Sequence, residues 1–267
     1  MNFYRYTRLG RPMVWSERSN QIAVIGTVLA GALAIGRGLI GGGGFHIADA
    51  IHVGGSAFIG WAIAREIDPD HPGTATVAMV LATLLAFGPW RSDLLIAGIA
   101  LLGLRVLAGT VGGRLKPLDL VVLVGAASFC GTPISGWGVA LLLVIAVLDA
   151  QPDGYGIATM AMLVGAFIAG FVAEVGRPTS QMSDAVLLWG LIAAVGIVLS
   201  IRPTRIMSRT DIYDHPIIWP KVRAARVMAG FAVIGGLIAS DSDTLVLLVP
   251  VVAALIGTAL VRTFRPA

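Results

Sequence analysis

The tripeptide Asp-His-Pro occurs twice in this chain, at 70–72 and at 214–216. Each copy follows further acidic residues: Glu66 and Asp68 precede the first copy, and Asp211 precedes the second. Carboxylate oxygens combined with imidazole nitrogens suit a divalent cation such as Mg²⁺ or Mn²⁺. The two copies therefore predict a divalent metal site with the following ligands: Asp68, Asp70, His71, Asp214 and His215.

Basic residues flank the second copy. Arg205 and Arg209 precede it, and Lys221 follows it. Guanidinium and ammonium groups bind phosphate through charge-assisted hydrogen bonds, so we predict that these three residues hold a phosphate or diphosphate group of a substrate. Helix initiation is the alternative explanation for both tripeptides, because aspartate caps helices and proline fits their first turn.

A third group of ionisable residues, His46, Asp49 and His52, lies at the start of an apolar segment. Spacings of three residues place its members on neighbouring turns of one helix. A carboxylate beside an imidazole favours the protonated imidazole, which suits proton transfer. We predict Asp49 and His52 as catalytic residues. The alternative is a structural ion pair of Asp49 with Arg37 or Arg105.

Arg105 lies inside a long apolar segment at 93–110. A charged residue at such a position faces the interior of a helix bundle or a water-filled cavity by default. Its guanidinium can clamp a phosphate or carboxylate, so we predict a substrate-binding residue. Alternatively, its long side chain extends along the helix until the charge reaches the membrane surface.

The composition indicates an integral membrane protein. Hydrophobic residues make up 57% of the 267 residues and charged residues 13%, whereas about 25% of residues are charged in a typical soluble domain. Mean hydropathy is +0.87. The net charge of +4 comes from basic residues at the ends of apolar segments, so no nucleic-acid partner is expected. Cys130 is the single cysteine, which excludes an intramolecular disulfide.

The apolar residues fall into ten segments, which predict an all-α bundle of about ten (8–10) transmembrane helices in one domain, 1–267. Pro250 interrupts the last segment. The fifth and sixth segments are the shortest, and we leave open whether 118–150 forms two spans or one re-entrant hairpin. The predicted segments are 20–36, 46–64, 74–89, 93–110, 118–131, 135–150, 156–175, 184–201, 225–240 and 244–261.

The distribution of basic residues predicts that both termini are cytoplasmic. With this orientation, most of the 19 Lys and Arg residues lie on the cytoplasmic side, as the positive-inside rule requires. The longest polar segment, 202–224, becomes a basic cytoplasmic loop. We therefore expect a multi-pass protein of the cell (inner) membrane, in contact with membrane lipids.

Three functions are compatible with these patterns. The first is a membrane enzyme or lipid-handling protein that acts on a phosphorylated, lipid-linked substrate at the cytoplasmic face. The second is a small-solute or proton-linked transporter that uses Asp49, His52 and Arg105. The third is a non-catalytic membrane subunit, which would require a second copy of itself or a membrane partner protein against a face of small residues at 166–170.

Overall fold

The computed structural model describes residues 7–11, 13–88, 92–131, 136–150, 165, 206–238 and 248–264. Over these residues the fold is all-α, and the only β pairing is an isolated bridge between Arg209 and Pro216. The eight helices of the described ranges are α1 (Arg18–Ile40), α2 (Ile47–Ile67), α3 (Pro72–Ala86), α4 (Leu94–Ala108), α5 (Pro117–Gly131), α6 (Trp137–Ala150), α9 (Trp219–Ile238) and α10 (Val249–Phe264).

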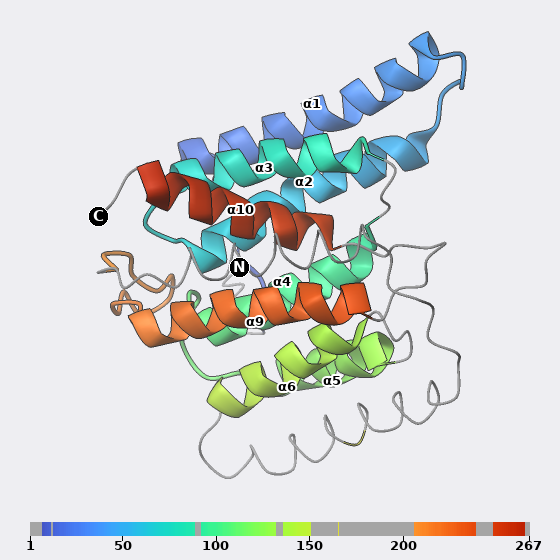
Figure 1. The fold of residues 1–267 in the computed structure, drawn as a ribbon. Coiled ribbons are helices and arrows are strands. Elements are labelled where there is room, and N and C mark those ends of the chain that lie inside the picture. The colour runs from blue at the N-terminus through green and yellow to red at the C-terminus, as the bar shows by residue number, and fades with distance from the viewer. Residues whose placement is uncertain are drawn as a thin grey trace.

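The described helices form two groups of four (Figure 1). One group contains α1, α2, α3 and α10, and the other contains α4, α5, α6 and α9. Helix α2 is central, because it packs against α1, α3 and α10 in its own group and against α4 and α9 in the other. A second connection between the groups is the packing of α9 on α10.

Local sequence signals explain several helix boundaries. The Asp93 carboxylate caps α4 by accepting hydrogen bonds from two backbone N–H groups, at 2.9 and 3.0 Å. Gly109 ends the same helix with a φ of +67°, a conformation that glycine adopts without strain. Pro72 and Pro117 are the first residues of α3 and α5. Pro250 is the second residue of α10, so it lies where a missing N–H group is tolerated.

Small residues allow the helices to approach closely. A Cβ atom at Gly138 of α6 would lie 2.8 Å from the backbone of Ala232 in α9. A Cβ atom at Gly257 of α10 would lie 3.1 Å from the backbone nitrogen of Ala78 in α3. Glycine at these two positions therefore permits backbone-to-backbone packing of both helix pairs.

Two described helices, α1 with 23 residues and α2 with 21, are long and apolar enough to cross a membrane. Five other apolar helices have only 14 to 16 residues. At about 1.5 Å per residue they are shorter than a hydrocarbon core of about 30 Å. Helix α9 has 20 residues but carries three basic side chains near its start. The described residues thus contain two candidate membrane-spanning helices, and a ten-span bundle is not confirmed.

The predicted apolar segments nevertheless coincide with the helices. Eight of the ten segments overlap the eight described helices, and the remaining two, 156–175 and 184–201, lie outside the described residues except for residue 165. Residues 118–150 contain two separate helices, α5 and α6, which pack against each other. Residues 219–224, which we expected in the basic loop, form the first turns of α9.

Candidate functional site

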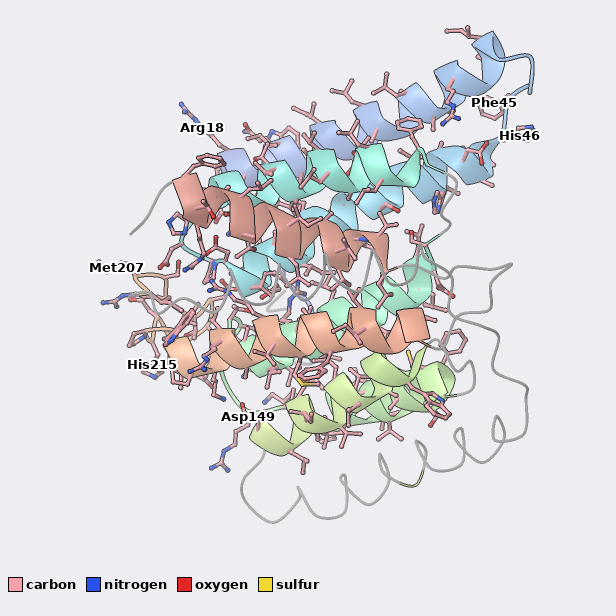
Figure 2. The ribbon with its side chains drawn as sticks, viewed as in Figure 1. Arg18, Phe45, His46, Asp149, Met207 and His215 are labelled. Carbon is pink, nitrogen blue, oxygen red and sulfur yellow. The ribbon has the colours of Figure 1, made fainter. Side chains whose placement is uncertain are left out.

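The two ends of the bundle differ in the residues that they collect (Figure 2). Arg18, Asp149, Met207 and His215 lie at one end, and Phe45 and His46 lie at the other. We call the first the hairpin end, because it contains the hairpin loop formed by residues 206–217, and the second the His46 end. Helix α2 runs from the His46 end, where it begins at Ile47, to the hairpin end, so its last turn and the first Asp-His-Pro copy belong to the hairpin end.

Residues 206–217, the hairpin loop, form a folded element at the hairpin end. Its two arms are joined by hydrogen bonds from the Thr210 N–H to the His215 carbonyl, 2.8 Å, and from the Ile217 N–H to the Ser208 carbonyl, 3.1 Å. Its turn also donates backbone hydrogen bonds to the α4–α5 connection, from Asp211 and Ile212 to the carbonyls of Thr110 and Val111. The loop is therefore fixed to the ends of the helices.

Asp70, of the first tripeptide, holds the base of the hairpin loop. Its carboxylate accepts hydrogen bonds from the backbone N–H groups of Met207 at 2.9 Å and Ser208 at 2.7 Å. Partial burial raises the pKa of this carboxyl group, but the hydrogen bonds from Ser208 and Met207 outweigh burial, so its pKa lies below the ordinary value. Asp70 therefore joins the first tripeptide to the segment that contains the second.

Asp68 lies at the centre of a buried ion cluster. Its carboxylate is fully buried and contacts the guanidinium groups of Arg262 at 2.5 Å and Arg226 at 3.3 Å. Thr74 donates a hydrogen bond of 2.7 Å to the same carboxylate, and the His71 Nδ1 atom lies 3.2 Å from it. Because these partners come from α3, α9 and α10, the cluster fastens three helices to the end of α2.

Glu66, in the last turn of α2 and two residues before Asp68, forms a second buried ion pair. Its carboxylate accepts a hydrogen bond of 2.6 Å from the Arg105 Nε atom and another from the Thr110 hydroxyl. The Arg105 Nη1 atom donates to the Leu9 carbonyl at 2.7 Å. Arg105 therefore links α2, α4 and the segment before α1, and its guanidinium is nearly enclosed by protein.

The segment before α1 is held by Asp119 of α5. The Asp119 carboxylate is fully buried and accepts hydrogen bonds from the Thr7 hydroxyl, the Arg8 N–H and the Lys116 N–H. Arg11, farther along the segment, forms a 2.5 Å ion pair with Asp211 of the hairpin loop. The segment therefore passes over the helix ends as a fixed strap between α5 and the hairpin loop.

Beneath this strap lies an amphipathic cavity of about 780 Å³. Helix α2 supplies residues of one face, at spacings of three and four, and α4 lies opposite. Its apolar lining includes Phe58, Trp61, Leu101, Leu102 and Val122, and its charged lining includes Arg11, Glu17, Arg65, Glu66, Arg105, Arg209 and Asp211.

Two polar atoms of this lining are buried without a hydrogen-bond partner among the described residues. They are the Trp61 Nε1 atom and the Arg65 Nε atom. The Trp61 side chain is only 5% exposed, it stacks on Phe58, and the Arg65 guanidinium lies 5.8 Å from the centre of its ring. Because buried N–H groups rarely stay unpaired, these two donors indicate a place for a hydrogen-bond acceptor.

A second cavity, of about 560 Å³, lies at the His46 end. Its lining includes Arg37, Asp49 and His52. In the described part of the chain, Asp49 forms an ion pair with neither Arg37 nor Arg105. Arg105 pairs with Glu66, which lies about 25 Å along α2 from Asp49 at 1.5 Å per residue. The fold therefore separates Arg105 from the other two residues of the predicted transport group.

The predicted metal ligands share the hairpin end but have different partners. Asp68 and His71 contact each other, and Asp70 binds the base of the hairpin loop. Asp214 is exposed near the turn of that loop and pairs with Arg209 at 2.7 Å, while His215 stacks on Tyr213. In the described ranges no three His, Cys, Asp or Glu residues form a metal-binding group. The metal site and the catalytic roles of Asp49 and His52 remain predictions.

The predicted phosphate-binding residues are placed as follows. Arg105 and Arg209 line the amphipathic cavity, whereas Lys221 lies in the first turn of α9 and pairs with Asp149 at 2.7 Å. Arg205 lies outside the described residues. Trp61 and Arg65 were not predicted as binding residues. Their spacing of four on one helix face, beside Phe58 and Glu66, is the signal that points to them.

Comparison with known proteins adds no assignment. Searches against protein-family models, curated proteins and solved structures find no match for this chain.

Proposed function

We propose that the chain is a multi-pass integral membrane protein whose hairpin end faces the cytoplasm. The outer surface of α1 supports this proposal, because large apolar side chains remain exposed along its whole length while its few buried residues are mostly alanine. Such a continuous apolar surface suits contact with lipid. The exposed residues are Ile22, Val24, Ile25, Val28, Leu29, Leu33, Leu39 and Ile40.

The charges at the helix ends support this orientation. Arg18 begins α1, Arg65 and Arg105 lie in the last turns of α2 and α4, and Arg262 lies in the last turn of α10. All four positions belong to the hairpin end, whereas Arg37 in the last turn of α1 belongs to the His46 end. The positive-inside rule places the more basic end in the cytoplasm.

Within this membrane protein, the amphipathic cavity binds a phosphorylated lipid. The observation that carries this assignment is the pair of unpartnered donors on α2, the Trp61 Nε1 atom and the Arg65 Nε atom, in a cavity that is apolar on one side and charged on the other. A phosphate oxygen would accept hydrogen bonds from both donors. An acyl chain would occupy the apolar side beside Phe58, Leu101 and Leu102.

The charges of the lining favour an anionic headgroup. Four arginines and three carboxylates line the cavity. Glu66 is neutralised by Arg105 and Asp211 by Arg11, so these carboxylates do not repel a phosphate strongly. The Arg209–Asp214 pair is largely exposed and therefore weak, which leaves the Arg209 guanidinium able to reorient toward a ligand.

The proposal assigns lipid binding and handling to this end and includes no metal-dependent step. Glu66, which lines the cavity, and Asp68, two residues farther along the chain, each accept hydrogen bonds from arginine. A metal ion would have to displace these guanidinium groups and leave them buried without a counter-charge, which is costly. Arginine side chains are therefore the groups that would recognise the phosphate.

A binding experiment tests the assignment. Binding of a fluorescent short-chain phosphatidic acid to the full-length protein in neutral detergent can be followed by fluorescence anisotropy. Arg65→Gln should weaken binding about tenfold, because a hydrogen bond to a charged group contributes about 1.5–3 kcal/mol. Trp61→Phe should weaken it less, because a neutral donor is lost.

Arg18→Gln is the matched control, because Arg18 is exposed at the same end of the molecule and does not line the cavity. It should leave the affinity unchanged. The corresponding diacylglycerol probe, which lacks the phosphate, should bind weakly and equally to all three variants. Wild-type affinity for phosphatidic acid in both Arg65→Gln and Trp61→Phe would refute the assignment.

A solute permease is a second candidate, favoured by the cavity at the His46 end that Asp49, His52 and Arg37 line. An ionisable residue that lines a cavity in a membrane protein is a candidate for substrate or proton binding. Under this alternative, uptake of a labelled solute into vesicles would fall when Asp49 is replaced by Asn. It would not respond to Arg65→Gln, since Arg65 lies at the hairpin end.

A further inference from the structure

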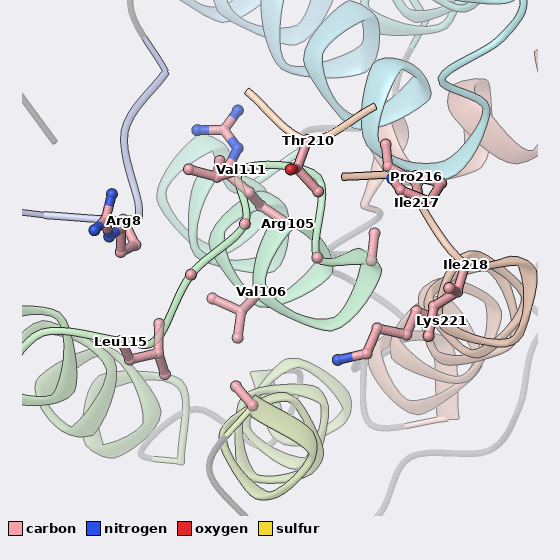
Figure 3. Close-up of a pocket in the computed structure, with 15 residues that line it drawn as sticks. Arg8, Arg105, Val106, Val111, Leu115, Thr210, Pro216, Ile217, Ile218 and Lys221 are labelled. Atoms are coloured by element: carbon pink, nitrogen blue, oxygen red, sulfur yellow. The ribbon is translucent and has the colours of Figure 1, made fainter. Parts of the chain in front are cut away.

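A smaller cavity, of about 220 Å³, shares Arg105 and Ile217 in its lining with the amphipathic cavity (Figure 3). It is enclosed by the α4–α5 connection, the hairpin loop and the start of α9. Its charged lining residues are Arg8, Arg105 and Lys221, and no carboxylate lines it among the residues that the structure describes. In Figure 3, Arg8 and Lys221 lie on opposite sides of the view, with Val106 between them.

The wall of this cavity is built from a glycine turn that few other residues could form. Gly109, Gly112 and Gly113 have φ values of +67°, +82° and +84°. A Cβ atom at Gly112 would lie 2.9 Å from the Thr210 Cβ atom, and one at Gly113 would lie 3.0 Å from the Tyr213 ring. The turn is therefore held directly against the hairpin loop, and its shape does not depend on a ligand.

Arg8 contributes a buried donor to this cavity. Its backbone N–H is held by Asp119, while its guanidinium lies 5.8 Å from the centre of the Tyr213 ring. The Nε atom is buried and has no hydrogen-bond partner in the described part of the chain. A guanidinium that is packed on an aromatic ring and keeps an unpaired donor is prepared to bind an oxyanion.

Lys221 is the second cationic side chain, after Arg8, that can contact a ligand in this cavity. Its ammonium group pairs with Asp149 at 2.7 Å, but about a third of both side chains is exposed. Such surface pairs contribute about 0–1 kcal/mol, so an anion in the cavity can compete with Asp149 for Lys221. Arg105 adds positive potential but stays paired with Glu66.

We propose that this cavity is a second anion site, which binds one phosphate group through Arg8 and Lys221. The phosphate is either free inorganic phosphate or the headgroup of a lipid, and the experiment below separates these sources. The proposal does not rest on the lipid assignment of the amphipathic cavity, because a different cavity and different donors carry it.

The test is a titration of the purified full-length protein in neutral detergent with inorganic phosphate, measured by isothermal titration calorimetry. Arg8→Gln and Lys221→Gln should each weaken binding about tenfold, as expected for loss of a charge-assisted hydrogen bond. Asp149→Asn should have the opposite effect and tighten binding about two- to fivefold, because it releases Lys221 from its partner.

Asp149→Asn also separates ligand binding from a structural role. If Lys221 mattered only through its ion pair, Asp149→Asn and Lys221→Gln would weaken binding alike, and this outcome would overturn the proposal. Arg18→Gln is the control from the same end, because Arg18 is exposed and lines neither of the two cavities. Each variant should unfold thermally at the same temperature as the wild-type protein. We expect this of Lys221→Gln in particular, because Lys221 is partly exposed at the surface.

Short-chain phosphatidic acid is the second probe. If phosphatidic acid displaces inorganic phosphate from both the wild-type protein and Arg65→Gln, the phosphate group that this cavity binds is a lipid headgroup. Absence of displacement would identify free phosphate, and both results support the site. Phosphate binding that is absent, or insensitive to both Arg8→Gln and Lys221→Gln, would refute it whatever happens at the amphipathic cavity.

Discussion

The two Asp-His-Pro tripeptides have the same sequence and lie at the same end of the molecule, yet their surroundings are opposite. Around the first copy, at 70–72, Asp68 is fully buried in an ion cluster and Asp70 binds backbone amides. Around the second, at 214–216, Asp214 is 77% exposed in its side chain and pairs only with Arg209 among the described residues. The tripeptide itself therefore does not determine the environment.

The difference follows from what each copy connects. The first copy joins α2 to α3, so its acids lie between helices that must be held together, and buried arginines of α9 and α10 reach them. The second copy lies beyond the turn of a hairpin loop, and Asp214 occupies a left-handed conformation with a φ of +53°. Aspartate tolerates this conformation, which suits a turn. One copy stabilises packing, and the other shapes a loop.

The largest effect expected from this comparison is that of Asp68→Ala. It would leave Arg226 and Arg262 buried beside each other without their shared carboxylate. Removing one partner of a buried ion pair costs about 3–5 kcal/mol, so the free energy of unfolding should fall by about that amount. Denaturant unfolding of the protein in detergent, followed by circular dichroism, would measure it.

Asp211→Ala is the matched control, since Asp211 is the acid that precedes the second copy. Its pair with Arg11 is partly exposed, and its loss should cost about 1 kcal/mol or less. Equal destabilisation by the two substitutions would show that the surroundings of the two copies are energetically alike, against the structure.

The ion cluster also shows what the sequence could and could not predict. Hydropathy located eight helices because apolar periods and helix-start prolines are local signals. The partners of Asp68 are not local, since Arg226 and Arg262 lie 158 and 194 residues away along the chain. Neither arginine was predicted as a partner of Asp68, and the fold buries both beside it. The sequence predicted Asp68 as a metal ligand, whereas its arginine partners could be identified only from the fold.

The predicted number of spans is not confirmed for a related reason. The length of an apolar segment does not fix the length of its helix, because capping by Asp93 and termination at Gly109 make α4 shorter than the apolar segment at 93–110. The amphipathic cavity was also beyond sequence reasoning. It depends on a strap before α1 that Asp119 holds in place, and no local pattern links those two segments.

An intermediate effect is expected at the base of the hairpin loop. Asp70→Asn replaces a carboxylate that accepts two backbone hydrogen bonds, which should cost about 1 kcal/mol at this partly exposed position. Because the loop is an appendage of the bundle, the effect should be local opening rather than global unfolding. Hydrogen exchange at the amides of residues 207 and 208 should become faster, with the helices unchanged.

Acid should reproduce this effect in the wild-type protein. The pKa of Asp70 is lower in the folded state than its ordinary value, which is about 3.9. Its contribution is therefore complete above about pH 4 and is lost as the pH falls through the depressed folded-state value. Protection of the two amides should thus decrease in acid for wild type and stay constant for Asp70→Asn. Identical acid profiles in the two proteins would contradict this role.

The smallest effect is expected for Asp214→Gly, at the equivalent position of the second copy. The substitution removes an exposed ion pair with Arg209, which contributes about 0–1 kcal/mol. It also places glycine at a positive φ, which relieves a backbone cost of about 1 kcal/mol. Because the two terms oppose each other, the free energy of unfolding should change by less than about 0.5 kcal/mol. A loss of several kcal/mol, comparable with that of Asp68→Ala, would mean that Asp214 has a partner or ligand that makes the second copy as important to the folded protein as the first.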